Sequence, residues 1–175
     1  RHKINFDKFA ASLREEHLFT KEIKDASKAE QYRNIDWTVP KAWFLGKTKA
    51  MRNVTFVCGK NKKTEAYITV LGGDGGGLLA NINRWRLQFG QTKLTEDLLK
   101  NLPEVEILDR HCKYVKLNGD YKGMANKSQD KATMIGIVCD LKHQTLFIKM
   151  VGPSSEVDAE EKHFKEFIKS IRYRK

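Results

Sequence analysis

A cluster of glycines followed by a helical pattern constrains the fold of this chain more than any other feature. Between Gly72 and Gly77 every residue except Asp74 is glycine. The next segment, Leu78–Phe89, repeats apolar side chains at the spacing of one helix face. Glycine adopts the positive φ angles that a sharp turn requires. The pattern therefore predicts a sharp turn that opens an amphipathic helix, with Gly90 as its C-terminal stop.

A glycine cluster at the start of a helix can also cradle a phosphate, because helix N-termini attract anions. The Walker loop, however, requires Lys-Ser or Lys-Thr after its last glycine, and here Leu78 and Leu79 follow. The glycines do not have G-x-G-x-x-G spacing, and Asp74 would repel a phosphate. The sequence favours an architectural turn, in which Asp74 caps the helix or accepts hydrogen bonds from turn amides.

Polar residues are dense in and beside this turn, and their role can be interpreted in two ways. As a candidate binding surface for an acidic group or a peptide, the set comprises Asp74, Asn81, Asn83, Arg84 and Arg86. In the other interpretation Trp85 belongs to the core, and its polar neighbours bond local backbone groups to fix the turn. The second interpretation is favoured, and the first remains the leading hypothesis for a functional surface.

The rest of the chain alternates between strand-like and helical patterns. Strands are expected at Asp36–Pro40, with Trp37 and Val39 on one side, at Arg52–Cys58 and Thr64–Leu71, at Val105–Leu108 and Cys112–Leu117, and at Lys131–Cys139 and Gln144–Val151. A tight turn is expected at Asn118–Gly119. Further helices are expected at Asn5–His17, at Glu96–Leu102 with Thr95 as cap, and after Ser154 or Ser155 as cap, with Val157, Phe164, Ile168 and Ile171 facing the core.

This order of elements predicts an α/β (α+β) fold. Consecutive strands joined by hairpins give a central antiparallel sheet flanked by helices rather than a Rossmann alternation. Residues 1–35 are expected to form an N-terminal helix and connector, and residues 36–175 a single α/β domain.

The chain is basic, with a formal net charge of +11. Such a charge attracts anionic polymers, anionic membranes or acidic proteins. Lysine is spread along the sequence, however, which favours a solvated basic surface over a dedicated patch. The segments Lys60–Lys63 and Arg172–Lys175 lack the interleaved aromatic residues of RNA-binding sheets, so the nucleic-acid signal is weak. No apolar run reaches the ~20 residues that span a bilayer.

Nothing in the sequence selects a catalytic residue, a cofactor or a metal site. The five histidines show no H-E-x-x-H spacing, and no G-x-S-x-G elbow occurs. The three cysteines, Cys58, Cys112 and Cys139, are odd in number and have no C-x-x-C spacing. Buried free thiols are expected, and one pair with a free thiol is the alternative in an oxidising compartment.

Several segments resemble the PsbP-like fold family, which includes the photosystem II extrinsic protein PsbP and the Ran-binding Mog-type factors. The entry Trp37–Trp43 is similar to the family's strand followed by P-x-x-W. The glycine turn with Asn81–Arg86 resembles the "N-x-N-R-W-R" helix of a bacterial branch of exported, lipoprotein-like members. The closing strand Leu146–Pro153 and the helix that follows also fit this family, and the resemblance spans Asp36 to Arg172.

The resemblance implies an α/β sandwich and suggests that a signal or lipoprotein leader was removed before Arg1. It carries over neither manganese nor Ran binding, because no residues here match those sites. The leading hypothesis is a non-enzymatic extracytoplasmic binding or accessory domain, with a protein or an acidic ligand as partner and a membrane link only through the leader. The alternatives are an enzyme with a pocket near Asp74 and Arg84, and a weak binder of polyanions.

Overall fold

The computed structural model describes residues 35–123 and 128–174. Asp36–Tyr173 forms one compact unit, and the fold described below is that of this unit. The helix expected at Asn5–His17 and the connector after it lie outside the described residues.

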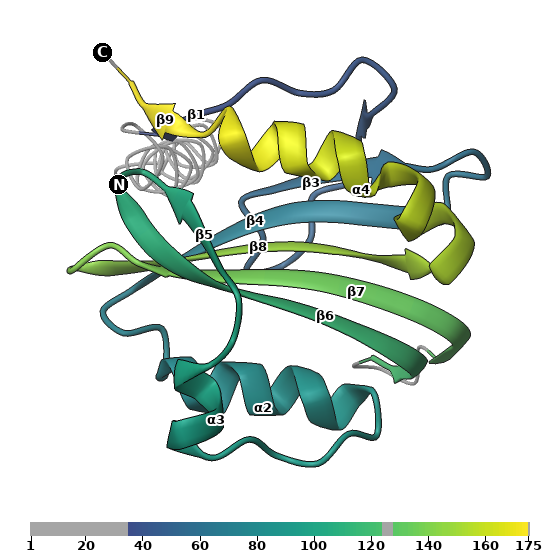
Figure 1. Ribbon diagram of the computed structural model, residues 1–175. Coiled ribbons are helices and arrows are strands. Elements are labelled where there is room, and N and C mark those ends of the chain that lie inside the picture. Colours follow the sequence, from purple (N-terminus) through teal and green to yellow (C-terminus); the bar gives the residue numbers. More distant parts are fainter. Residues whose placement is uncertain (1–34, 124–127, 175) are drawn as a thin grey trace, which may run out of the picture. The chain divides into compact units, whose positions relative to one another are not determined.

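The unit is built on one antiparallel sheet of seven strands (Figure 1). In spatial order the strands are β2 (Phe44–Leu45), β3 (Val54–Cys58), β4 (Thr64–Gly72), β8 (Gln144–Pro153), β7 (Ser128–Asp140), β6 (Arg110–Lys122) and β5 (Glu104–Ile107). The predicted hairpins β3–β4 and β7–β8 are present, with Cys58 opposite Thr64 and Asp140 opposite Thr145. The predicted α+β fold with a central antiparallel sheet is thus confirmed.

One face of the sheet is covered by α2 (Leu78–Gln88), with α3 (Glu96–Lys100) beside it (Figure 1). The α2 side chains Ile82 and Trp85 are buried against the sheet, as their helical spacing predicts. Gly136 on β7 leaves room for the Trp85 ring, because a Cβ at this position would lie 2.5 Å from the ring carbon Cζ3. The helix ends as predicted at Gly90, whose φ of 64° is accompanied by a Schellman pair of hydrogen bonds.

The opposite face of the sheet is covered by α4 (Ser154–Lys169) (Figure 1). The predicted inward side chains Val157, Phe164, Ile168 and Ile171 are all buried. Trp43, which precedes β2, joins this layer and packs its ring 5.2 Å from that of Phe167. Its indole nitrogen donates a 2.8 Å hydrogen bond to Glu160 on α4. The two helical layers therefore sit on different faces of one sheet.

The predictions of one turn and of one helix cap are wrong. Asn118–Gly119 is not a tight turn, because β6 continues to Lys122 in register with β7 and Gly119 sits at an irregularity with a φ of 145°. Neither Ser154 nor Ser155 caps α4, since Pro153 occupies the cap position. The Ser154 hydroxyl donates instead to the carbonyl of Lys131.

The strand expected at Asp36–Pro40 is reduced to β1 (Ile35–Asp36). Trp37 is only partly buried and Val39 is exposed, whereas Trp43 is the tryptophan that enters the core. The carboxylate of Asp36 pairs at 2.6 Å with Arg172 in the short strand β9 (Arg172–Tyr173). Proline at position 40 lacks an N–H for a ladder, which agrees with the early end of this strand.

Cys112 and Cys139 form a disulfide, and Cys58 is free and buried. The two bonded residues lie opposite each other on β6 and β7, with their Cα atoms 4.5 Å apart, as in non-hydrogen-bonded antiparallel pairs. The expectation of three free thiols is corrected to the alternative of one pair and one free thiol. The register of β6 against β7 brings these cysteines together, and this register cannot be derived from the spacing of the cysteines in the sequence.

Candidate functional site

The glycine turn is fixed by bonds to the neighbouring hairpin and to itself. Gly73 donates to the carbonyl of His143 and accepts from the Thr145 hydroxyl, each at 2.9 Å. Gly75 has a φ of 59°, and a Cβ there would lie 2.9 Å from both Thr145 and Phe147. Asp74 accepts a 2.9 Å hydrogen bond from the amide of Gly76, so it bonds a turn amide and does not cap the helix.

The asparagines of the candidate surface are buried and bond local backbone. Asn81 is 1% exposed and donates to the carbonyls of Gly75 and Gly77 at 2.9 and 2.7 Å. Asn83 makes a two-way bond with Leu94, donating to its carbonyl and accepting from its amide. These residues hold the turn and the α2–α3 connection in place, and their side-chain donors are occupied.

The two arginines of the candidate surface differ in their hydrogen-bond partners. Arg86 donates to the carbonyl of Thr92 at 2.7 Å and so supports the loop after α2. Arg84 is exposed, and among the described residues its side chain donates only to the side-chain oxygen of Asn81, so further N–H groups have no partner within the described part of the chain. Of the five predicted residues, Arg84 is the one whose position suits it to meet a ligand.

A groove of about 950 Å³ runs along α2 and includes Arg84. The residues that line it are Gly77, Leu78, Leu79, Ala80, Asn83, Arg84, Leu87, Gln88, Lys93, Glu96, Leu99 and Lys122. Six of these twelve residues are glycine, alanine or leucine, and the other six are polar, four of them charged. The groove therefore offers apolar surface beside charged groups, a combination found in ligand sites. Asp74, Asn81 and Arg86 do not line it.

One apolar side chain of this groove is open to a ligand, because Leu87 in its lining is 53% exposed. The side-chain oxygen of Gln88 is buried and has no hydrogen-bond partner among the described residues. A buried acceptor without a partner is costly, but a ligand would reach this oxygen only after the Gln88 side chain turned toward the groove.

Three cations, Arg52, Arg84 and Lys149, are close enough to interact near the place where α2 packs on the sheet. Lys149 on β8 is 8% exposed, with its amine 4.6 Å from the Trp85 ring centre and 5.7 Å from that of Tyr67. Among the described residues it forms no hydrogen bond or ion pair. Burial, with the nearby charges of Arg52 and Arg84, lowers the pKa of Lys149 to about 7. The three cations make this region favourable for an anion.

Arg52 is the member of this group that has a carboxylate partner. Its guanidinium stacks 3.6 Å over the Tyr67 ring and donates at 2.8 Å to Glu65. Glu65 also accepts from Lys49, so one carboxylate serves two cations. Burial acts to raise the pKa of Glu65, but these bonds outweigh it and the pKa is lowered.

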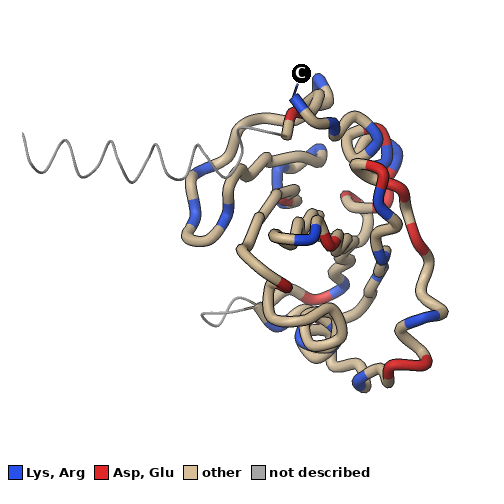
Figure 2. Tube along the Cα trace, turned by 90° about the vertical axis from the view of Figure 1, so that its left-hand side faces the viewer, with Lys and Arg blue, Asp and Glu red and all other residues tan. Residues whose placement is uncertain are grey.

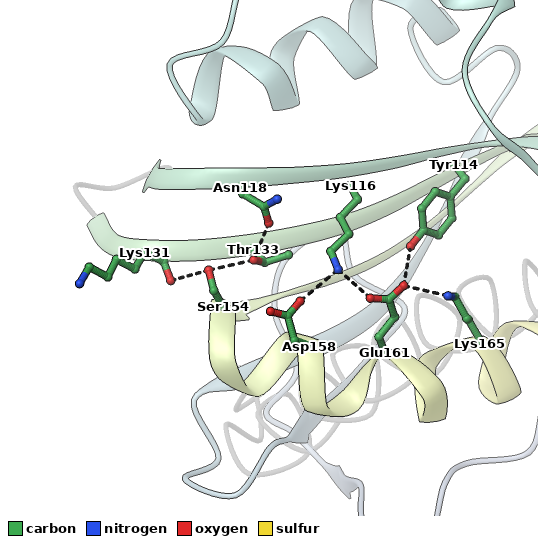
Figure 3. A network of polar contacts seen from close by, with 9 residues as sticks. All are labelled: Tyr114, Lys116, Asn118, Lys131, Thr133, Ser154, Asp158, Glu161 and Lys165. Atoms are coloured by element: carbon green, nitrogen blue, oxygen red, sulfur yellow. Dashed lines mark hydrogen bonds and ion pairs between the residues drawn. The ribbon is translucent and has the colours of Figure 1, made fainter.

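A second polar network joins α4 to β6 and is internally balanced (Figure 3). Lys116 pairs with Glu161 at 2.7 Å and with Asp158 at 3.0 Å, and Lys165 pairs with Glu161 at 2.8 Å. The hydrogen bond to Glu161 raises the pKa of Lys116, and the bond from Lys116 lowers that of Glu161. Lys116 and Lys165 each have a carboxylate partner, so these ion pairs attach the helix and leave neither of the two charges for a ligand.

Within residues 35–123 and 128–174, no three His, Cys, Asp or Glu side chains gather in a way that could hold a metal ion. No described helix combines the length and apolar character needed to cross a membrane.

Solved structures share the fold of this chain at low sequence identity. A crystal structure from Bacteroides thetaiotaomicron has a TM-score of 0.50 at 13% identity and covers 81% of this chain and 45% of that one. LpqN, involved in cell envelope biogenesis of Mycobacterium tuberculosis, has a TM-score of 0.47 at 15% identity, covering 81% and 83%. Cyanobacterial PsbP (CyanoP) from Synechocystis has a TM-score of 0.46 at 8% identity, covering 81% and 94%.

The described unit has a mixed α+β fold with a large antiparallel sheet, and cyanobacterial PsbP is among the structures to which it is similar. The chain spans less than half of the Bacteroides protein. No family model and no curated protein sequence matches the chain.

Sequence analysis missed Arg52 and Lys149. A signal for Lys149 exists, because it is the one charged residue in the otherwise uncharged strand Gln144–Pro153. A lone lysine in such a strand can equally reach solvent, and only the position of Trp85 over the neighbouring Gly136 shows that it is covered.

Proposed function

We propose that this chain is a non-enzymatic binding domain whose ligand is an amphipathic anion held in the groove along α2. The observation that carries the proposal is the groove of about 950 Å³, with leucines in its lining and Arg84 in its wall. An apolar body would rest on Leu79 and Leu87, and its acidic group would pair with Arg84. Lys149 and Arg52 lie behind Arg84 and add an attractive field for that group.

The Cys112–Cys139 disulfide supports an extracytoplasmic setting for this domain, because disulfides persist in oxidising compartments. This part of the proposal is tested by alkylation of the protein as isolated from its natural source, followed by mass spectrometry. Alkylation of Cys58 alone, after denaturation, is the expected result. Alkylation of all three cysteines would place the protein in a reducing compartment.

Binding is tested with dodecanoate and dodecyl phosphate, which share one apolar chain and differ in their acidic group. Both are expected to displace anilinonaphthalene sulfonate from the groove, whereas uncharged dodecanol binds about tenfold more weakly. A preference for one acidic group distinguishes carboxylate from phosphate ligands. Equal binding of all three compounds would show that the cations take no part.

The variants Arg84→Ala and Leu87→Ala are each expected to weaken binding about tenfold. Two matched controls are Lys169→Ala on α4 and Leu98→Ala on α3, since Leu98 is 52% exposed against 53% for Leu87. Neither control residue lines the groove. If the controls weaken binding as much as the groove variants do, the ligand lies elsewhere.

An enzymatic alternative rests on the Lys149 amine, which is buried beside the rings of Trp85 and Tyr67 without a carboxylate partner among the described residues, an environment that lowers its pKa. An amine with a pKa of about 7 is partly neutral at physiological pH and can attack a carbonyl to form an imine. Incubation with pyruvate and cyanoborohydride, followed by peptide mapping, tests this alternative. Selective reduction onto Lys149 would support an imine-forming enzyme, and labelling of exposed lysines alone would exclude it.

A further inference from the structure

The first part of the domain, from Lys41 to Glu65, concentrates positive charge at one end of the sheet. This segment contains seven Lys or Arg residues, and Glu65 is its only acidic residue. It forms β2, β3 and the two loops that flank β3. In Figure 2 the side of the domain that holds these strands carries basic residues with almost no acidic ones, whereas the two signs mix on the other side.

The same segment exposes large apolar side chains. On the edge strand β2, Phe44 is 55% exposed and Leu45 78% exposed. In the loop that follows, Met51 is 73% exposed. Elsewhere in the described residues, large exposed apolar side chains occur only singly, at Leu87, Leu98 and Tyr173, apart from Val39 just before β2. We name this surface the basic edge. It consists of Phe44, Leu45 and Met51 together with Lys41, Lys47, Lys49, Lys60, Lys62 and Lys63.

The β3–β4 turn is held beside β2, which unites two basic stretches that are separate in the sequence. The Lys62 amine lies 4.7 Å from the ring centre of Phe44. The turn itself is fixed by Glu156 on α4, which accepts hydrogen bonds from the amides of Asn61 and Lys63 at 2.9 and 3.2 Å. Lysines of this turn therefore have a defined position next to the exposed side chains of β2.

Apart from Lys49, which pairs with Glu65, the lysines of the basic edge have no carboxylate partner among the described residues. Lys41, Lys47, Lys60, Lys62 and Lys63 form no ion pair with any described residue. Glu156, the nearest fixed carboxylate, is 5% exposed and already takes its hydrogen bonds from backbone amides and Thr64. The field of these lysines is therefore directed outward.

From this juxtaposition we infer that the basic edge docks onto an anionic lipid bilayer, with its lysines at the headgroups and Leu45 and Met51 inserted at the interface. Flexible aliphatic side chains among lysines suit a lipid surface, where apolar groups bury below anionic headgroups. They suit nucleic acid less well, because bases stack on free aromatic faces, and Lys62 lies over the Phe44 ring. This surface is distinct from the groove on α2 and does not depend on the function proposed for it.

The test is co-sedimentation of the full chain with vesicles of phosphatidylcholine, alone or mixed in equal parts with phosphatidylglycerol. Binding to the mixed vesicles is expected, with little binding to phosphatidylcholine alone. The double variants Leu45→Ser with Met51→Ser, and Lys47→Glu with Lys60→Glu, are each expected to reduce partitioning about tenfold. Added salt should weaken the binding that remains in the first variant more than in the second.

Matched controls change the same chemistry on other surfaces. Leu98→Ser with Tyr173→Ser removes two exposed large side chains outside the groove, and Lys162→Glu with Lys169→Glu reverses two exposed charges on α4. These variants should bind vesicles like the wild type. Circular dichroism before sedimentation confirms that each variant is folded.

Three results would overturn the inference. The first is absence of binding to the anionic vesicles. The second is an equal loss of binding in the control variants, which would indicate attraction by net charge alone. The third is that the wild type is a dimer that does not bind the vesicles and that Leu45→Ser converts this dimer to a monomer. This result would assign the basic edge to contacts between copies of the chain.

Discussion

Two lysines in the same sheet have opposite surroundings. Lys116 on β6 faces α4 and pairs with Asp158 and Glu161, whereas Lys149 on β8 faces α2 and has no carboxylate partner among the described residues. The pKa of Lys116 is raised by its bond to Glu161, and that of Lys149 is lowered to about 7 by burial and neighbouring cations. The lysine on the α4 side thus has carboxylate partners, whereas the lysine on the α2 side lacks one within the described part of the chain, and an anionic ligand could supply the missing charge.

The largest expected effect tests how tightly α2 packs on its face. Gly136→Ala should lose about 3 kcal/mol, because the new Cβ would lie 2.5 Å from Trp85 and the helix would have to shift. Urea unfolding measures the loss. Gly72→Ala is the matched control, since a Cβ at Gly72 meets nothing within 4 Å, and it should be nearly neutral. If the two variants are equally stable, α2 is not packed on Gly136.

A smaller effect of opposite sign is expected at Lys149. Its folded pKa lies below its unfolded value, so the unfolded chain binds an extra proton between about pH 7 and the ordinary lysine value of 10.5. The cost of this lysine is therefore greatest below pH 7 and declines as the pH rises through that window. Lys149→Met should stabilise the protein by about 2 kcal/mol at pH 6, and its advantage should fall toward pH 10.

Thermal unfolding at pH 6, 8 and 10 checks this expectation, with Lys162→Met on the exposed face of α4 as the control. A variant that is less stable than the wild type at every pH would show that Lys149 has a stabilising partner. The comparison between the two lysines would then fail.

The smallest effect is expected at Lys116. Lys116→Met should lose about 0.5–1 kcal/mol at pH 7, because its ion pairs are partly exposed to solvent. The raised pKa means that this contribution is complete below the ordinary lysine pKa and disappears as the pH rises through the folded value. The gap between the variant and the wild type should close in strong alkali and narrow in high salt. A gap that widens with pH would contradict the assignment of charges in this network.

Periodicity along the chain was sufficient to predict the hairpins, α2, α4 and the sheet of this domain. Where it failed, a distant contact decided the outcome. Asn118–Gly119 has turn chemistry, but pairing with β7 keeps it within β6. Trp37 was expected in a strand on the core side, whereas packing against Phe167 places Trp43 in the core.

The candidate site shows the same limit. Arg84 could be singled out because it stands beside an unusual turn on a clear helix. Lys149 could not, because its burial depends on Trp85 and Gly136 from two other elements. The lysines around β2 were interpreted as spread along the sequence, and the contact between Lys62 and Phe44 gathers them in space.

Each of the two helical layers contains a tryptophan that can serve as an intrinsic fluorescence probe. Trp43 reports the α4 side through its bond to the Glu160 carboxylate, and Trp85 reports the α2 side beside the Lys149 amine. With Trp37 and either Trp43 or Trp85 replaced by phenylalanine, the remaining tryptophan would emit from one layer alone. Fluorescence could then show whether the two layers melt in one cooperative transition or in succession, and which of them responds when a ligand is added.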